Sequence, residues 1–338
     1  AYIVRRTLII GIFMGVFAVV VSAGVMISMK KAKETIPKPT PAPSFEFGRI
    51  PPIHFPPGKT YPSTFELQTI AGRPPEGTPS SELFFIPSKT PTLFSRRNAA
   101  DFAEQLGFTG QPTTISDTLY HYTDEATNST FTLDITNQNF LMKRNYLDPS
   151  MFEEKINPTQ QNIKQLAVSY FQSLKVWDTA LSESKITYLT LEGTTLTPTS
   201  KLENAQVYRI DFFRGPIEGY PVVTSLFHTS PIYLIFAANT SRIQNILEAS
   251  FQNFPPLLGD SATYPTISGQ AAWEQLQNGK GYIAVPLQTG TQAVIRTVYL
   301  AYFQEDQYHP YLQLVWVFEG DHGFVGMVPA LDPVWIEQ

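Results

Sequence analysis

Histidine and acidic residues near the C-terminus are the side chains best suited to chemistry in this 338-residue sequence. Imidazole nitrogens and carboxylate oxygens can bind zinc or act as general acids and bases. They form two groups, Glu305, Asp306 and His309, and then Glu319, Asp321 and His322. A predicted strand separates the groups by about 30 Å at ~3.3 Å per residue. They therefore cannot share a metal ion, and we interpret each group as a solvated turn.

Other catalytic signatures are missing from the sequence. The five histidines include no pair at i, i+4 and no HExxH motif. The absence of cysteine excludes a thiolate nucleophile, a disulfide framework and a cysteine-bound metal. There is no GxSxG elbow, although a triad assembled in space stays open. We predict no catalytic, cofactor or metal site and a non-enzymatic protein, with an envelope hydrolase as an alternative.

Aromatic residues crowd the predicted last hairpin, whose strands are expected at 293–303 and 311–319. Alternate residues of a strand face the same side. Tyr311 therefore lies on one face, and Trp316 and Phe318 lie on the other. Both faces are apolar, so two interpretations stay open. The strand is either buried on both sides, or one face of its sheet receives a partner's strand or peptide. Under the second interpretation the candidate binding residues are Trp316 and Phe318 on one face and Tyr311 on the other.

An uncharged run of 23 residues lies near the start of the chain, from Thr7 to Met29. At 1.5 Å per residue it spans about 35 Å, enough to cross a bilayer core of about 30 Å. We predict a transmembrane anchor within residues 1–34; a cleaved signal peptide is the alternative. Small residues fall on one stripe of this helix and predict a helix-packing seam: Gly11, Gly15, Ala18 and Ser22. The alternative is that small residues are simply common in membrane helices.

Charge is distributed unevenly between the anchor and the rest of the chain. Residues 1–34 hold five basic residues and one acidic residue, so the total of −5 leaves −9 for the remainder. An acidic body repels nucleic acid, so we predict no nucleic-acid partner. The basic flanks favour a cytoplasmic body, but large domains translocate largely regardless of charge. A Pro-rich stretch after the anchor is typical of an envelope stalk. We predict a single-pass protein of the bacterial cytoplasmic membrane, with its C-terminal body outside the cytoplasm.

The rest of the chain divides into a stalk and three repeated units. Residues 35–62 are rich in proline, which favours extended polyproline geometry. We predict that this stretch is a free stalk as far as Pro43. Its second half is apolar, so we predict that it packs on the first unit. Each unit then reads as a helix followed by antiparallel strands, at 63–150, 151–258 and 259–338. This order predicts an α+β fold of tandem units, each with a helix packed on antiparallel sheet.

Several of these motifs resemble known bacterial envelope proteins. RRNAADFAEQLGF followed by STFTLDITNQNFLMK resembles the PepSY-type unit, and AAWEQLQNGKGYIAV resembles part of the YycI/YycH-like extracytoplasmic regulators. FGRIPPIHFPPG is similar to membrane-anchored proteins of bacterial candidate phyla. The resemblance implies an extracytoplasmic binding or regulatory role and transfers no site residue. The implied partners are the lipid bilayer and another membrane or envelope protein, or a second copy. A structural subunit of an envelope assembly or filament is the alternative.

Overall fold

The computed structural model describes residues 42–146, 152, 157–237 and 245–337. The predicted transmembrane segment and its seam of Gly11, Gly15, Ala18 and Ser22 lie outside these residues. No helix in the described ranges is long and apolar enough to cross a membrane. The α+β class is confirmed: the described chain is mostly antiparallel sheet with few helices.

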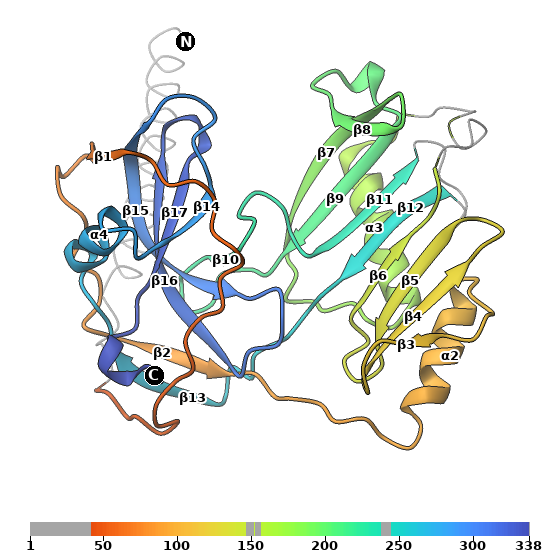
Figure 1. Ribbon diagram of the computed structural model, residues 1–338, viewed down its shortest axis with the longest axis horizontal. Coiled ribbons are helices and arrows are strands. Elements are labelled where there is room, and N and C mark those ends of the chain that lie inside the picture. Colours follow the sequence, from red (N-terminus) through yellow and green to blue (C-terminus); the bar gives the residue numbers. More distant parts are fainter. Residues whose placement is uncertain (1–41, 147–151, 153–156, 238–244, 338) are drawn as a thin grey trace, which may run out of the picture. The chain divides into compact units, whose positions relative to one another are not determined.

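A nine-stranded antiparallel sheet contains the middle of the chain (Figure 1). The spatial order of its strands is β3-β4-β5-β6-β12-β11-β9-β7-β8. Alternation of Phe131 and Leu133 with threonine gives β5 one buried face, as the sequence predicts. The strands are β3 (Thr113–Thr114), β4 (Leu119–Asp124), β5 (Ser129–Asp134), β6 (Phe140–Lys143), β7 (Glu183–Glu192), β8 (Thr195–Pro198), β9 (Val207–Phe213), β11 (Ile232–Ala237) and β12 (Ile246–Phe251).

Two helices pack on this sheet, α2 (Ser95–Gln105) and α3 (Gln160–Ser173). Their apolar residues recur at helical spacing and share one core with β4, β5, β6, β9, β11 and β12. Thr159 caps α3, because its side chain accepts a hydrogen bond from the Asn162 amide. Ser95 is the first helical residue of α2, and its hydroxyl accepts a hydrogen bond from the Thr92 amide.

An eight-stranded sheet contains the C-terminal strands, and α4 (Gly269–Gln277) packs against its strand β17. Here β1 and β10 pair with β15 in parallel, and the remaining pairs are antiparallel. The strands are β1 (Thr64–Leu67), β2 (Ser80–Phe85), β10 (Val222–Thr224), β13 (Ser261–Pro265), β14 (Tyr282–Val285), β15 (Gln292–Gln304), β16 (Tyr311–Gly320) and β17 (Val325–Pro329). Short 3₁₀ turns complete the described chain at Leu202–Asn204, Asp321–Gly323 and Pro333–Trp335.

The pairing of β1 and β2 differs from the predicted organisation. Both strands lie in the predicted first unit, residues 63–150, yet they pair with β15 and β16 of the predicted third unit. These strands are far apart in the sequence, so no local sequence pattern predicts that they pair. The boundaries of the three units stay a prediction.

Residues 44–61, called the strap from here on, pack along the eight-stranded sheet. The strap is predicted to pack on the first unit, and Phe47 does meet Phe85 of β2 in that unit, with ring centroids 6.4 Å apart, but the strap also packs on the C-terminal strands. Ile50 bridges to Ile336 in parallel, and its amide donates to the Trp335 carbonyl at 2.8 Å. The Phe55 ring stacks on Tyr282 with ring centroids 4.8 Å apart. Ile53 and Phe55 thereby cover an apolar cluster formed by β14, β15, β16 and β17.

Candidate functional site

The aromatic residues of β16 are largely internal. Trp316 is 1% exposed and Phe318 is fully buried, both in the core beneath α4. The Trp316 indole N–H donates to the Ile267 carbonyl at 3.0 Å. Tyr311 is half-buried and stacks on Phe47 of the strap, with centroids 4.9 Å apart. This packing follows the interpretation of a strand buried on both sides, and Trp316 and Phe318 offer a partner no free surface here.

In the turn between β15 and β16, Glu305 and His309 are buried, contrary to the predicted solvated turn, while Gln307 and Tyr308 are exposed. Glu305 is 8% exposed and His309 is 2% exposed. The second predicted group lies at the far end of β16, where Asp321 pairs with Arg296 at 2.6 Å. The separation expected for the two groups is therefore confirmed, but the solvated interpretation of the first group is wrong. The strap, which covers this turn, is the reason for its burial.

His54 of the strap completes a cluster at the buried turn. The His54 amide donates to Glu305 Oε2 at 3.1 Å, and its Nδ1 lies 3.6 Å from the same oxygen. Glu305 Oε1 lies 3.5 Å from His309 Nδ1. One ligand atom from each of these residues lies within 4.8 Å of the others. Two imidazoles and a carboxylate thus converge on one small volume.

The electrostatic environment of Glu305 favours its neutral form. Burial raises the pKa of Glu305 to about 7, against a lowering by the His54 amide, and the neighbouring Asp306 charge raises it further. The ion pairs of Glu305 in the described chain are with His54 and His309, and none is with a lysine or arginine. The Glu305 carboxylate is therefore buried, and no lysine or arginine of the described chain pairs with it.

His309 is held as a neutral imidazole. Burial lowers its pKa, although the Tyr311 backbone acts in the opposite direction. His309 Nδ1 lies 2.8 Å from the Tyr311 carbonyl oxygen and 3.2 Å from the Tyr311 amide nitrogen, and it donates to the carbonyl in the tautomer that carries the proton on Nδ1. In that tautomer Nε2 carries a lone pair, and within the described residues this buried atom has no hydrogen-bond partner, although the Pro51 and Pro52 backbones also act on the ring. A neutral imidazole with one nitrogen fixed by a backbone carbonyl is the usual state of a metal-binding histidine.

A second carboxylate borders the cluster. Asp306 accepts a hydrogen bond from the Ser225 hydroxyl, and burial raises the pKa of Asp306. Its Oδ1 is buried without a partner. Because the Ser225 hydroxyl is directed to a carboxylate rather than to an imidazole, this arrangement is not the serine–histidine pair of a nucleophilic enzyme.

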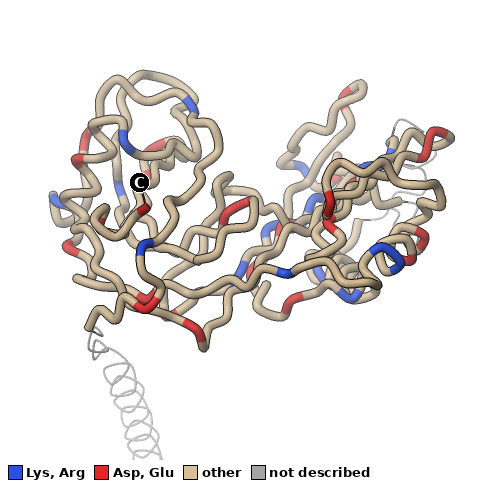
Figure 2. The backbone as a smooth tube through the Cα atoms, turned by 60° about the horizontal axis from the view of Figure 1, so that its bottom comes forward, with Lys and Arg blue, Asp and Glu red and all other residues tan. Residues whose placement is uncertain are grey.

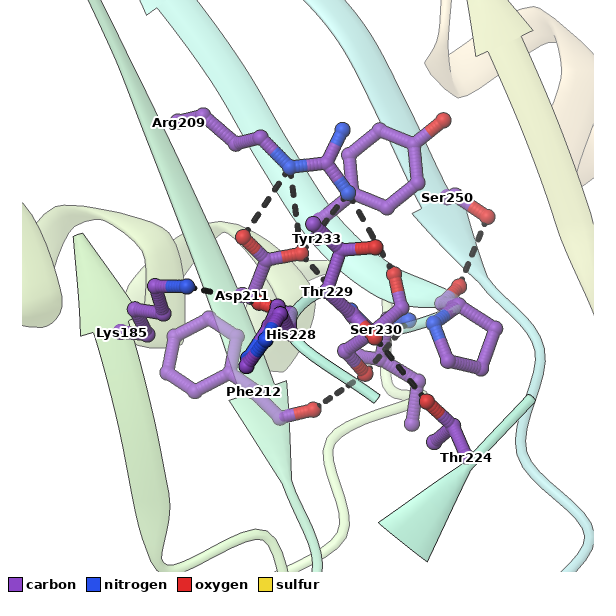
Figure 3. Close-up of polar contacts among 12 residues, drawn as sticks. Lys185, Arg209, Asp211, Phe212, Thr224, His228, Thr229, Ser230, Tyr233 and Ser250 are labelled. Atoms are coloured by element: carbon purple, nitrogen blue, oxygen red, sulfur yellow. Dashed lines mark hydrogen bonds and ion pairs between the residues drawn. The ribbon is translucent and has the colours of Figure 1, made fainter. Parts of the chain in front are cut away.

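A polar network holds the loop that carries Ser225 (Figure 3). Asp211 is fully buried, accepts from the Ser230 amide at 2.9 Å, and pairs with Arg209 at 2.7 Å. The Arg209 guanidinium lies 3.8 Å above the Tyr233 ring. Thr224 donates to the Thr229 carbonyl at 3.0 Å and closes the loop. The network anchors residues 224–230 to β9 and β11, and β10 at the start of this loop pairs with β15.

Sequence reasoning missed His54 as a member of this cluster. His54 precedes Glu305 by 251 positions, so no local spacing links them. The one available signal is the apolar character of the proline-rich segment around it, which predicts packing but not the surface that it covers.

A second concave surface lies beside α2. A cavity of about 420 Å³ is bordered by apolar Ala99, Phe102, Leu133 and Ile135 and by polar Lys89 and Gln138. Next to it, Leu93 is 98% exposed and Phe94 is 65% exposed. Charged residues are dispersed along the described chain (Figure 2), and exposed Arg96 and Arg97 follow soon after Phe94, so this surface combines exposed apolar side chains with basic ones.

Comparison with known proteins adds two distant structural likenesses. No family model matches the sequence, and no curated protein matches it. An uncharacterized protein from Eubacterium rectale is 11% identical over 79% of this chain and 87% of its own, with a TM-score of 0.40. The C-terminal domain of Bacillus megaterium YpeB is 11% identical over 72% of this chain and 94% of its own, with a TM-score of 0.27. At these TM-scores neither likeness carries a functional argument.

Proposed function

We propose that this chain is a single-pass, membrane-anchored extracytoplasmic protein that binds a partner protein and is not an enzyme. The observation that carries the proposal is the strap. The segment that follows the predicted anchor is built into the eight-stranded sheet through Ile50, His54 and Phe55. Only 14 residues separate Met29 from Ser44. Even fully extended they reach about 50 Å at ~3.4 Å per residue, so the body stays close to the bilayer.

The surface beside α2 is the partner site that we propose. Leu93 and Phe94 expose apolar side chains next to a cavity lined by both polar and apolar residues, and such a combination favours a protein or peptide ligand. α2 itself is fixed from below by Phe102, whose ring stacks on Phe131 with centroids 5.8 Å apart. The exposed pair is therefore presented on a rigid element.

The resemblance to PepSY-type units fits this proposal. α2 is followed by β3 to β6, α3 is followed by β7, β8, β9, β11 and β12 of the same sheet, and the two sets join where β6 pairs with β12. We interpret them as two tandem units that share one sheet. Tandem units of this kind in an extracytoplasmic regulator act through protein contacts, which is the role proposed here.

Membrane topology is tested by adding protease to intact spheroplasts that contain the full chain. The proposal predicts loss of the body without lysis, while a cytoplasmic marker protein survives. Survival of the body until lysis would place it in the cytoplasm and overturn the localisation.

Partner binding is tested with a photo-crosslinking amino acid at position 94 of the full chain in its own membrane. We expect a discrete adduct that is lost on Leu93→Ser. The same probe at exposed Ile70, which is distant in sequence from α2, is the control and should give no such adduct. Equal adducts at both positions would remove the α2 surface from the proposal. Ordered arrays of the protein in electron micrographs of native envelopes would instead favour a structural subunit.

A further inference from the structure

We propose that His54, Glu305 and His309 form a binding site for a divalent transition-metal ion, with Zn²⁺ as the best match, which fastens the strap to the last hairpin. The site lies between the strap and the β15–β16 turn, and each side supplies ligands. It does not depend on the partner site beside α2.

The first argument is the donor set. Two neutral imidazoles and one carboxylate are the protein ligands of many zinc sites that keep a position for water. Ligand atoms at ~2.1 Å from a tetrahedral ion lie about 3.4 Å from one another. The 3.6 Å from Glu305 Oε2 to His54 Nδ1 is near this value and is too long for a strong hydrogen bond, and a ring nitrogen of His309 lies within 4.8 Å of a ligand atom of each of these residues.

The second argument is an unpartnered atom. His309 is 2% exposed, yet its Nε2 has no hydrogen-bond partner, while Nδ1 meets the Tyr311 carbonyl. A buried polar atom without a partner destabilises the fold. A metal ion would use this lone pair, and the backbone carbonyl on the other nitrogen would orient the ring.

The third argument is charge. Glu305 and Asp306 lie side by side in a turn, both largely buried, and the described chain gives neither of them a lysine or arginine partner. Buried carboxylates are ordinarily paired with a positive group or bound to a metal. A divalent cation would supply the missing positive charge for both residues.

The His54 side chain is free to move onto a bound ion. It is 72% exposed, so the imidazole can rotate toward the ion without disturbing the core. All three ligand atoms already lie within 4.8 Å of one another, so the required movement is about 1 Å. Metal binding would add a cross-link to the hydrogen bond between the His54 amide and Glu305, and the strap could then leave the sheet only after the ion dissociates.

The test uses the full chain in detergent, stripped with a chelator and titrated with zinc sulfate by calorimetry. We expect one Zn²⁺ per chain, and tetrahedral d–d absorption when Co²⁺ replaces it. His54→Ala and Glu305→Gln should each weaken zinc binding by at least about 100-fold, beyond the 10–100-fold of a supporting residue. His322→Ala, at the opposite end of the hairpin, is the matched control and should bind as the unmodified chain does.

A second readout measures the strap itself. Trypsin cleavage after Arg49 requires the strap to open, because the next residue, Ile50, is fully buried and its amide is bonded to the Trp335 carbonyl. At a zinc concentration of 100 times Kd, opening should be suppressed by about 100-fold in the unmodified chain and not in His54→Ala. Because His54 is exposed, this variant folds even if Glu305→Gln does not. Absence of stoichiometric binding, or full-strength binding by His54→Ala, would overturn the site.

Discussion

The two sheets of this protein obtain their cover in different ways. The nine-stranded sheet is covered by α2 and α3, which lie within the same stretch of chain as its strands. The eight-stranded sheet has α4 on one side, but on the other side it is covered by Ile53 and Phe55 of the strap, more than 200 positions before the strands that they contact. Local covering elements leave a periodic pattern in the sequence, and a distant extended segment does not.

This contrast explains why the buried chemistry lies where it does. An extended proline-rich segment can bring few apolar residues to a sheet and leaves polar backbone and side chains in contact with it. In the eight-stranded sheet His54, Glu305 and Gln313 occupy this boundary: Gln313 donates to the Pro51 carbonyl at 2.9 Å. The helix-covered face of the other sheet is filled by aromatic rings, such as Phe140 and Phe171.

Trp316→Ala should have the largest effect and sharpen the comparison. The indole is 1% exposed, and the loss of such a side chain costs about 3–5 kcal/mol of the free energy of unfolding. Phe140→Ala is the equivalent change in the nine-stranded sheet. Hydrogen exchange should show Trp316→Ala loosening β15 to β17 first and Phe140→Ala loosening β5, β6 and β12 first. A near-neutral Trp316→Ala would instead restore the partner-binding interpretation of this face.

Phe55→Ala tests whether the strap is part of the core. The Phe55 ring stacks on Tyr282, and its centroid lies 4.9 Å from the centroid of the Phe303 ring. Its removal should therefore lower the free energy of unfolding, measured with denaturant, by about 2 kcal/mol. The control is Phe94→Ala, because that ring is 65% exposed and should change stability by less than about 0.5 kcal/mol. Equal effects of the two variants would break the contrast between a strapped sheet and a free surface.

Acid should weaken the nine-stranded sheet through Asp178. Burial alone raises the pKa of this carboxyl, but hydrogen bonds from the Ala180 amide, Asn253 and Arg214 hold it below its usual range. A lowered pKa stabilises the fold above the ordinary value of about 4, and this contribution is lost as the pH falls further. Asp178→Asn should therefore cost about 1–2 kcal/mol at pH 7, and its difference from the unmodified chain should shrink below about pH 4. A pH-independent difference would contradict the role of the charge.

Ser230→Ala should give the smallest effect. The hydroxyl donates to the Phe212 carbonyl and accepts from the Ile232 amide, so its loss should cost about 1 kcal/mol of the free energy of unfolding. The readout is hydrogen exchange in residues 222–230, which should quicken, while exchange in α2 should not change. An equal change in hydrogen exchange across the whole chain would show that the effect of Ser230 is not confined to the loop between β10 and β11.

Much of the fold could be predicted from local pattern. The strands expected at 293–303 and 311–319 are present as β15 at Gln292–Gln304 and β16 at Tyr311–Gly320. β10 and β13 were missed because they are short and derive their stability from non-local pairing with β15 and β2. The cluster of His54, Glu305 and His309 could not be predicted, since its members are joined only by the path of the strap.

Hydrogen exchange of single amides in the strap tests the central claim most directly, namely that this segment couples the predicted anchor to the eight-stranded sheet. The Ile50 amide donates to the Trp335 carbonyl and the His54 amide to Glu305, so both should exchange at least about 100-fold more slowly than the amide of exposed Gly58. Exchange of Ile50 and His54 as fast as that of Gly58 would show a strap that is free of the sheet, and would contradict the account.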